Sequence, residues 1–158
     1  MKNEMKKDMK KESLDKAAKE KVIAKLNSIL EHELAGVVRY THYSFMIFGH
    51  NRIPIVKWLR EQAAESLSHA EVVGEYITTL GGHPSLKIAK LLETHKHSVN
   101  DILKESLSHE NEQINLYREL FEIVEDKSIL LEEFSRKMIA EEELHVSEFE
   151  KMLKSPGK

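Results

Sequence analysis

Apolar residues recur at spacings of three and four along four long stretches of the chain, and this periodicity predicts four amphipathic helices. The stretches cover about residues 13–49, 54–80, 98–125 and 129–153. Short turns are indicated at Gly49-His50-Asn51 and Asp126-Lys127-Ser128, and Gly81-Gly82-His83-Pro84 is typical of a helix C-terminus. We therefore expect an all-α fold.

The connection at residues 85–97 is too long for a simple helical hairpin. At about 3.3 Å per extended residue, a dozen residues cross about 40 Å. This is the length of a helix of about 27 residues at roughly 1.5 Å per residue. A crossover of this length makes the second and third helices parallel, so we expect a four-helix bundle with one long crossover.

The last predicted helix carries two ionisable residues in the stripe that should be buried. Its stripe reads Leu131, Phe134, Met138, Glu142, His145, Phe149 and Met152. A carboxylate and an imidazole inside a helix core are costly unless a partner compensates them. A metal ion is one such partner.

Each of the other predicted helices also places an ionisable residue in the middle of its inward stripe. The full set is Glu33, Glu65 with His69, Glu110, and Glu142 with His145. The interval from Glu33 to Glu65 is 32 residues, as is that from Glu110 to Glu142, and Tyr40 and Tyr117 each follow the first glutamate of their half by seven residues. A repeated half related by a local two-fold would bring the two sets of ligands face to face.

The residue types suit two divalent metal ions. Four carboxylates and two imidazoles carry a total charge of −4, which balances two divalent cations. Carboxylates can bridge two metals, imidazole suits iron, and open positions admit O₂ or peroxide. Without metal, four acids this close repel one another, so metal should stabilise the bundle.

Composition excludes several kinds of site and gives no sign of a membrane or export segment. The net charge of −3 is close to balanced and the chain has no cysteine, which excludes disulfides and rubredoxin-type iron sites. No apolar run approaches the roughly 20 residues of a membrane span, and no apolar segment typical of a signal peptide follows the N-terminus. We expect a cytoplasmic protein without membrane contact.

Several titratable residues are left outside the predicted site. We expect Glu61 and Glu141 to be solvated, and the other histidines to lie at the surface or beside the ligands. These histidines are His32, His42, His50, His83, His95, His97 and His109.

The two ends of the chain are expected to lie outside the bundle, which we place at residues 13–154. Residues 1–12 are Lys-rich and predict a frayed tail, and residues 155–158 form a short C-terminal tail. A basic arm that contacts DNA is the alternative for residues 1–12, although interspersed acids weaken that interpretation.

From residue 22 to 153 the chain resembles the bacterioferritin branch of the ferritin-like superfamily. The residues that carry the resemblance are Leu26-Asn27, Leu30, Glu33-Leu34, Tyr40, His69-Ala70, Leu80-Gly81-Gly82 with Pro84, Glu110 with Tyr117, and Glu142 with His145. The resemblance implies a ferroxidase in which two Fe²⁺ per subunit are oxidised by O₂ or H₂O₂ and the Fe³⁺ is sequestered. It implies that Glu33, Glu110, Glu142, His69 and His145 are ligands, and that Tyr40 is a neighbouring hydrogen-bond or electron donor.

The sequence departs from the family pattern at three places. The family's second-helix glutamate falls at Ser66, so Glu65 is the available ligand, on the same helix face as His69. The family's haem-binding methionine falls at Leu67, and because leucine cannot ligate iron we expect no haem at that position. Only 13 residues follow His145, too few for the family's short fifth helix, so the expected homo-oligomer is a 24-mer, a dodecamer or a dimer.

Three other functions stay open at this point. One is a DNA-associating, iron-dependent protective mini-ferritin that uses the Lys-rich arm. Another is a di-iron peroxidase or oxidase that stores nothing, although no Cys-x-x-Cys electron-transfer domain is present for a standard rubrerythrin. The last is a structural bundle whose site has degenerated, with Ser66 as the sign of it.

Overall fold

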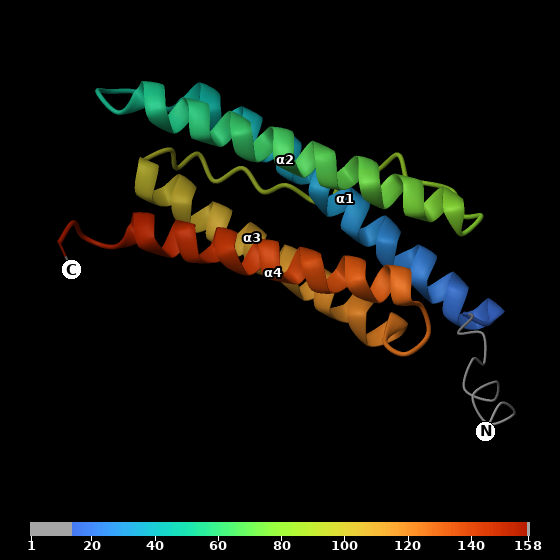
Figure 1. Cartoon of the computed structure of the whole chain (residues 1–158). Helices are drawn as coiled ribbons and strands as arrows, with labels where there is room; N and C mark the ends of the chain where they lie inside the picture. Colours follow the sequence, from blue (N-terminus) through green and yellow to red (C-terminus); the bar gives the residue numbers. More distant parts are fainter. Residues whose placement is uncertain (1–13, 158) are drawn as a thin grey trace, which may run out of the picture.

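The chain folds into four long helices in an elongated bundle (Figure 1). The structure is a computed structural model that describes residues 14–157, so the tail expected at residues 1–12 lies outside the described residues. The helices are α1 (Lys16–Met46), α2 (Arg52–Thr79), α3 (Val99–Val124) and α4 (Ile129–Leu153). The predicted all-α fold is confirmed, and the described part contains neither a strand nor a fifth helix.

Side-chain caps fix where three of the helices begin. Asp15 accepts a hydrogen bond from Ala18 N (2.7 Å), so α1 begins at Lys16, slightly later than expected. Ser98 caps α3 through Asp101 N (3.1 Å), and Ser128 caps α4 in the same way. Each cap satisfies an amide group that has no partner within the helix.

The end of α2 turns the chain into the crossover. Gly81 adopts a left-handed backbone (φ +77°), which costs a glycine little. Gly81 N donates to Thr78 O (2.9 Å) and Gly82 N donates to Ile77 O (2.8 Å). This pair of bonds is the Schellman motif, and it ends the helix where the sequence predicted.

The crossover runs back along α1, so that α2 and α3 point in the same direction (Figure 1). It is tied to α1 by hydrogen bonds from Ser85 N to Asn27 Oδ1 (2.7 Å) and from Ala89 N to Glu31 O (2.8 Å). The predicted long crossover between the second and third helices is therefore confirmed.

Side chains rather than close backbones join α2 to α4 along one seam of the bundle, where Tyr76 packs on Phe134 and Trp58 packs on Phe149. α1 packs against α2 and α3, and α3 packs against α4, whereas no Cα atoms of α2 and α4 approach within 8 Å. Two apolar clusters fill the bundle, one around Leu26, Tyr117 and Phe134 and the other around Leu59 and Phe149. Among the described helices, none is both long enough and apolar enough to cross a membrane.

Candidate metal centre

Three carboxylates are buried in the middle of the bundle, between the two apolar clusters. Glu33 on α1 is 3% exposed, Glu110 on α3 is 5% exposed and Glu142 on α4 is 2% exposed. Burying three acids at one place costs free energy unless hydrogen bonds, protons or cations compensate them. The partners of these carboxylates therefore show what the centre is built to hold.

Two buried tyrosines cross the bundle to hold two of the carboxylates. Tyr40 on α1 donates its hydroxyl to Glu110 on α3, and Tyr117 on α3 donates to Glu33 Oε1 on α1 (2.7 Å). The two bonds are reciprocal, as expected from glutamate and tyrosine positions that are each 77 residues apart in the two halves. Each tyrosine leaves other carboxylate lone pairs free for a further partner.

Two histidines and Glu142 complete two groups of candidate metal ligands, called the ligand groups below. Nδ1 of His69 lies 3.3 Å from Glu33 Oε1 and 3.5 Å from Glu142 Oε1. Nδ1 of His145 lies 3.2 Å from Glu142 Oε2 and 3.7 Å from Glu110 Oε2. Each group offers three ligand atoms that lie within 4.8 Å of one another. Glu142 belongs to both groups, one oxygen on each side, as in a carboxylate that bridges two metals.

Glu65 does not join either ligand group in the structure. Its side chain is 40% exposed, and its Oε1 lies 3.3 Å from Nε2 of His145, the ring nitrogen that faces away from the two groups. Glu141, which we expected to be solvated, is only partly exposed, and its Oε2 lies 3.8 Å from Nε2 of His69. Glu65 and Glu141 thus occupy matching places in the two halves, 76 residues apart.

Ser66 occupies the position that matches Glu142. Ser66 and Glu142 are 76 residues apart, as are His69 and His145, and Ser66 is buried against the same small cavity. The 32-residue interval pairs Glu142 with Glu65, whereas the 76-residue interval shared by the two histidines pairs Glu142 with Ser66. These two choices lie on different faces of α2, because one residue is about 100° of helix rotation. The matched position on α2 thus carries a hydroxyl in place of a carboxylate.

A stacked pair of histidines lies beside the centre, and the sequence did not assign it. The rings of His32 and His109 stack with centroids 4.0 Å apart, and both residues are buried. Each immediately precedes a ligand glutamate, so the 77-residue repeat was a signal that could have found them. We expected the extra histidines either at the surface or beside the ligands, and His32 and His109 lie beside the ligands.

Gly36 allows α1, α2 and α3 to meet closely next to that pair. A Cβ at Gly36 would lie 2.9 Å from Ser66 Oγ and 3.0 Å from Nε2 of His109. The residue 77 positions later is Gln113, whose amide donates to Glu33 Oε1 (3.1 Å) and whose side-chain oxygen contacts Nδ1 of His32. At this position the two halves therefore differ in side chain, glycine in the first and glutamine in the second.

Burial and mutual contacts shift the pKa values of the carboxylates and of His145 in opposite directions. Burial raises the pKa of Glu142 to about 9, and burial also raises the pKa of Glu33. Burial opposes ionisation of Glu110 as well, but contacts with His145 and Glu142 lower its pKa to about 2. Contacts with Glu110 and Glu142 raise the pKa of His145 to about 11. Glu142 and His145 therefore carry protons at neutral pH that a cation would have to displace.

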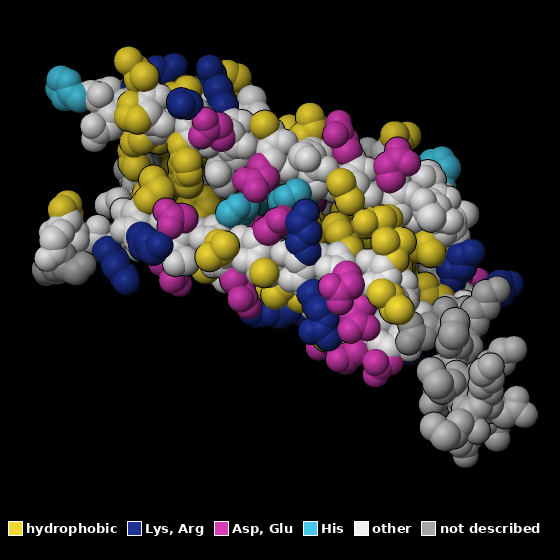
Figure 2. Space-filling model, viewed as in Figure 1, with side chains coloured by type: hydrophobic (Ala, Val, Ile, Leu, Met, Phe, Trp, Pro, Cys, Tyr) yellow, Lys and Arg dark blue, Asp and Glu magenta, His cyan; other side chains and the backbone are white. Residues whose placement is uncertain are grey.

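The centre opens toward solvent through the seam between α2 and α4. Figure 2 shows histidine and acidic side chains gathered along this seam. A cavity of about 10 Å³, room for roughly one water molecule, is lined by the ligand groups together with Gln62, Glu65 and Ser66. The exposed fraction rises from 12% at His69 and 21% at His145 to 37% at Glu141 and 40% at Glu65. The outer two carboxylates thus form the mouth of the centre.

The donor set fits two ions of the first-row transition metals. Each ligand group combines two carboxylates with one imidazole Nδ1, and such oxygen and nitrogen donors suit iron and manganese. The second imidazole nitrogen of each histidine lies within ion-pair distance of a carboxylate, on the side where a metal-ligating histidine usually donates a hydrogen bond. The predicted residues Glu33, His69, Glu110, Glu142 and His145 are therefore brought together, and Glu65 stands behind His145.

Comparisons with solved structures support the same fold. A diiron-carboxylate, ferritin-like protein of Bacillus anthracis aligns at 24% identity over 87% of this chain and 98% of its own, with a TM-score of 0.81. The bacterioferritin of Rhodobacter capsulatus aligns at 27% identity over 84% of this chain and 83% of its own, with a TM-score of 0.75. A dodecameric thioferritin of Bacteroides fragilis aligns at 22% identity over 89% and 87%, with a TM-score of 0.77.

The sequence itself also identifies the family. A search of curated proteins gave no match to the chain. The family model of the ferritin-like domain matches residues 23–156, which include all four helices almost entirely. The chain therefore belongs to the ferritin-like family.

Proposed function

We propose that the protein is a ferroxidase that oxidises two Fe²⁺ per subunit with O₂ or H₂O₂ and sequesters the Fe³⁺. The single observation that carries the proposal is the position of Glu142, whose two oxygens face two separate groups of ligands. A buried carboxylate shared in this way suits a pair of metal ions better than one ion. The fold and its diiron-carboxylate neighbour support an iron-handling role in general.

The residues of the proposed centre have three roles: they bind Fe²⁺, orient the carboxylates and release protons. Glu33 with His69 holds one substrate Fe²⁺, Glu110 with His145 holds the other, and Glu142 contacts both. Bound Fe²⁺ supplies one electron per ion, so a pair supplies the two electrons that reduce O₂ to peroxide or peroxide to water. Tyr40 and Tyr117 fix the carboxylates through their hydroxyl groups. Binding releases the protons of Glu142 and His145, which become available for the reduced oxygen.

Fe²⁺ reaches the centre through the seam between α2 and α4 in this proposal. Glu65 and Glu141 lie at the mouth, where partly exposed carboxylates attract a cation before it meets the buried ligands. Each also contacts Nε2 of a ligand histidine, so that it orients the imidazole whose Nδ1 faces the metal. We therefore assign Glu65 as a positioning and access residue, and no longer as a ligand equal to Glu142.

The test is the aerobic addition of Fe²⁺ to the metal-free protein. We expect two Fe²⁺ per chain to be oxidised in a fast phase, with consumption of O₂ or added H₂O₂ measured in parallel. Glu142→Ala should abolish the fast phase, and Glu61→Ala is the matched control because Glu61 is an exposed glutamate of α2. A fast phase that survives in Glu142→Ala would overturn the proposal.

Storage and assembly require a second measurement on the same samples. We propose a cytoplasmic homo-oligomer, in line with the dodecameric state of the Bacteroides fragilis protein. Native mass measurement after stepwise iron addition should show an oligomer that accumulates many Fe³⁺ per chain. An oxidation that stops at two irons per chain would instead identify a diiron oxidase that stores nothing.

A further inference from the structure

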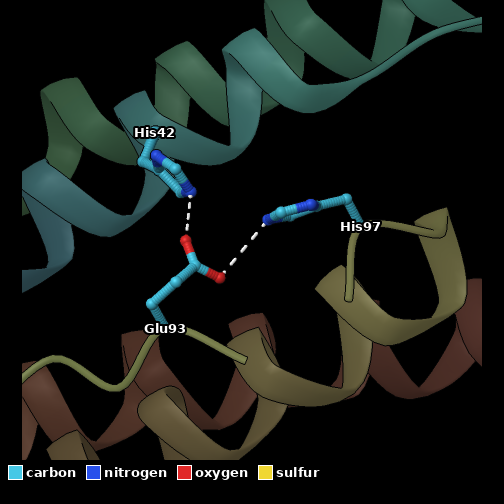
Figure 3. Close-up of side chains that lie close together, drawn as sticks. All are labelled: His42, Glu93 and His97. Atoms are coloured by element: carbon cyan, nitrogen blue, oxygen red, sulfur yellow. Dashed lines mark ion pairs between the residues drawn. The ribbon is translucent and has the colours of Figure 1, made fainter. Parts of the chain in front are cut away.

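A third group of metal-type ligands lies away from the buried centre. His42 on α1 faces Glu93 in the crossover, and Glu93 in turn faces His97 just before α3 (Figure 3). The three ligand atoms lie within 4.8 Å of one another. None of the three residues lines the cavity of the buried centre, so this group is a separate site.

The spacing of the three side chains suits one small cation. Nε2 of His42 lies 2.9 Å from Glu93 Oε2, and Nε2 of His97 lies 3.4 Å from Glu93 Oε1. Ligand atoms held at about 2.1 Å from a four-coordinate metal are roughly 3.4 Å apart. Each imidazole nitrogen lies near this distance from one of the two Glu93 oxygens, so small side-chain movements would bring both nitrogens and one oxygen around a cation.

The two imidazole nitrogens are left without hydrogen bonds. Nε2 of His42 and Nε2 of His97 are both buried from solvent, and neither has a hydrogen-bond partner among the described residues. Each lies within ion-pair distance of Glu93 but out of line for an N–H bond. Buried polar atoms are satisfied in almost all cases, so two unsatisfied nitrogens facing one carboxylate indicate a missing partner.

The crossover backbone is shaped to bring Glu93 and His97 together. Residues 93–97 are not helical, and His95 adopts a left-handed conformation (φ +56°) that is unfavourable for a residue with a Cβ. His95 N donates to Glu93 Oε1 (2.6 Å), and Thr94 donates its hydroxyl to Glu105 on α3. The strained turn therefore holds both potential ligands on the side that faces α1.

An arginine beside this group, Arg39, forms no ion pair with Glu93 among the described residues. Arg39, which lines the neighbouring pocket, donates to Tyr43 Oη (2.7 Å), and Tyr43 donates to Glu105 Oε2 (2.5 Å). Arg39 is thus linked to Glu105 on α3 through the Tyr43 hydroxyl. Glu93 accepts a hydrogen bond from His95 N and faces the two imidazoles, so its negative charge can balance one charge of a divalent cation.

We propose that His42, Glu93 and His97 bind a divalent transition-metal ion of the Zn²⁺ or Fe²⁺ class that fastens the crossover to α1. Two imidazoles and one carboxylate favour such ions over Mg²⁺ and Ca²⁺, which prefer sites made of oxygen ligands. Three protein ligands leave at least one coordination position for water. The site joins α1 to the segment that leads into α3, so the bound ion stabilises the crossover.

The test measures Zn²⁺ binding to the full-length, metal-free chain. Background variant His69→Gln/His145→Gln disables the buried centre, and His97→Gln or Glu93→Gln is then added to it. We expect the background variant to keep one tight Zn²⁺ per chain and each added substitution to weaken it by more than about 100-fold. Changes one shell beyond a metal already cost roughly 10–100-fold, so losing a direct ligand should cost more.

A matched control and a structural measurement decide the outcome. His83→Gln changes an exposed histidine at the start of the crossover and should leave Zn²⁺ binding unchanged. Zn²⁺ should also slow amide hydrogen exchange around Glu93 in the background variant and not after His97→Gln, with helix content equal by circular dichroism. Equal Zn²⁺ affinity with and without His97→Gln, or equal loss in His83→Gln, would overturn the site and would leave the proposed ferroxidase centre unaffected.

Discussion

The two halves of the bundle carry the same glutamate, tyrosine and histidine around the centre and differ at the position between them. The half made of α1 and α2 contributes Glu33, Tyr40 and His69, and the half made of α3 and α4 contributes Glu110, Tyr117 and His145. These residues meet by reciprocal contacts across the bundle. The halves diverge at the bridging position, which is Ser66 in the first half and Glu142 in the second.

This difference shows how a repeated fold can hold an asymmetric site. With Ser66 opposite Glu142, one carboxylate must serve both ligand groups, and Glu65 stands outside them behind His145. Helix α4 then contributes Glu142 to the first group and both Glu142 and His145 to the second, whereas α2 contributes only His69. Five measurements would test this comparison.

The largest effect is expected for Glu142→Gln compared with Glu65→Gln. Because Glu142 belongs to both ligand groups, its loss should reduce the rate of Fe²⁺ oxidation by at least about 100-fold. Glu65→Gln changes only a contact to the outer nitrogen of His145 and should cost about tenfold, in line with changes one shell beyond a metal. Stopped-flow absorbance after aerobic Fe²⁺ addition measures both, and equal losses would restore Glu65 as a ligand.

The same Glu142→Gln variant also has an expected effect on the metal-free protein. The pKa of Glu142 is about 9 in the folded protein and has its ordinary value of 4.5 in the unfolded chain. Between these two pH values Glu142 is ionised only in the unfolded chain, so the free energy of unfolding falls as pH rises from 4.5 to about 9. At pH 7, removing the carboxyl should raise the free energy of unfolding by on the order of 1–3 kcal/mol. Urea unfolding at pH 7 checks this and shows that lost activity does not reflect lost fold.

Ser66→Glu should make the two halves more alike. A carboxylate at this position would extend into the cavity that Ser66 already lines and would give α2 its own bridging ligand. We expect the second Fe²⁺ to bind about tenfold more tightly, an effect of roughly 1.4 kcal/mol. Anaerobic Fe²⁺ titration resolves the two binding steps, and weaker binding of both ions would show that the cavity has no room for the longer side chain.

Metal binding should depend on pH because the centre holds protons. Glu142 and His145 have pKa values of about 9 and about 11, so both lose a proton when a cation binds at neutral pH. Apparent affinity should rise up to about tenfold per pH unit for each proton released, between pH 6 and about pH 8. Isothermal titration with Zn²⁺ in buffers of different ionisation enthalpy counts the protons, and a count of zero would contradict this description.

The smallest effects are expected for Tyr40→Phe and Tyr117→Phe, which form a matched pair. Each loses one hydrogen bond to a buried carboxylate, which should cost about 1–3 kcal/mol of stability. If both tyrosines only orient carboxylates, the two variants should slow oxidation similarly and by a few fold. A much slower reaction or a changed spectrum in Tyr40→Phe alone would identify Tyr40 as the electron donor.

Much of the fold could be predicted from the sequence, because its signals are local. Periodicity gave four helices, and the length of residues 85–97 gave the crossover and the parallel direction of α2 and α3. The resemblance and the repeated glutamates and histidines indicated which residues would meet. That the centre binds iron stays a prediction, and the DNA-binding arm falls on residues that the structure does not describe.

The assignment of Glu65 could not be decided from spacing alone. Residues three and four positions before a histidine both share its helix face. Only the packing of α2 against its neighbours turns Ser66 toward the cavity and Glu65 toward its mouth. The 77-residue repeat contains both His32 and His109, but it does not show that their rings stack. That contact forms only because α1 and α3 lie side by side.

By itself, the sequence determined the helices, their order and the buried acids and imidazoles, because apolar periodicity and the cost of buried charge act along each helix separately. Tertiary structure decided which oxygen faces which nitrogen, how Glu142 comes to be shared, and that His42, Glu93 and His97 meet at the crossover. These outcomes depend on how each helix is rotated about its own axis and on contacts between segments that are distant in the sequence. No spacing along a single chain specifies them.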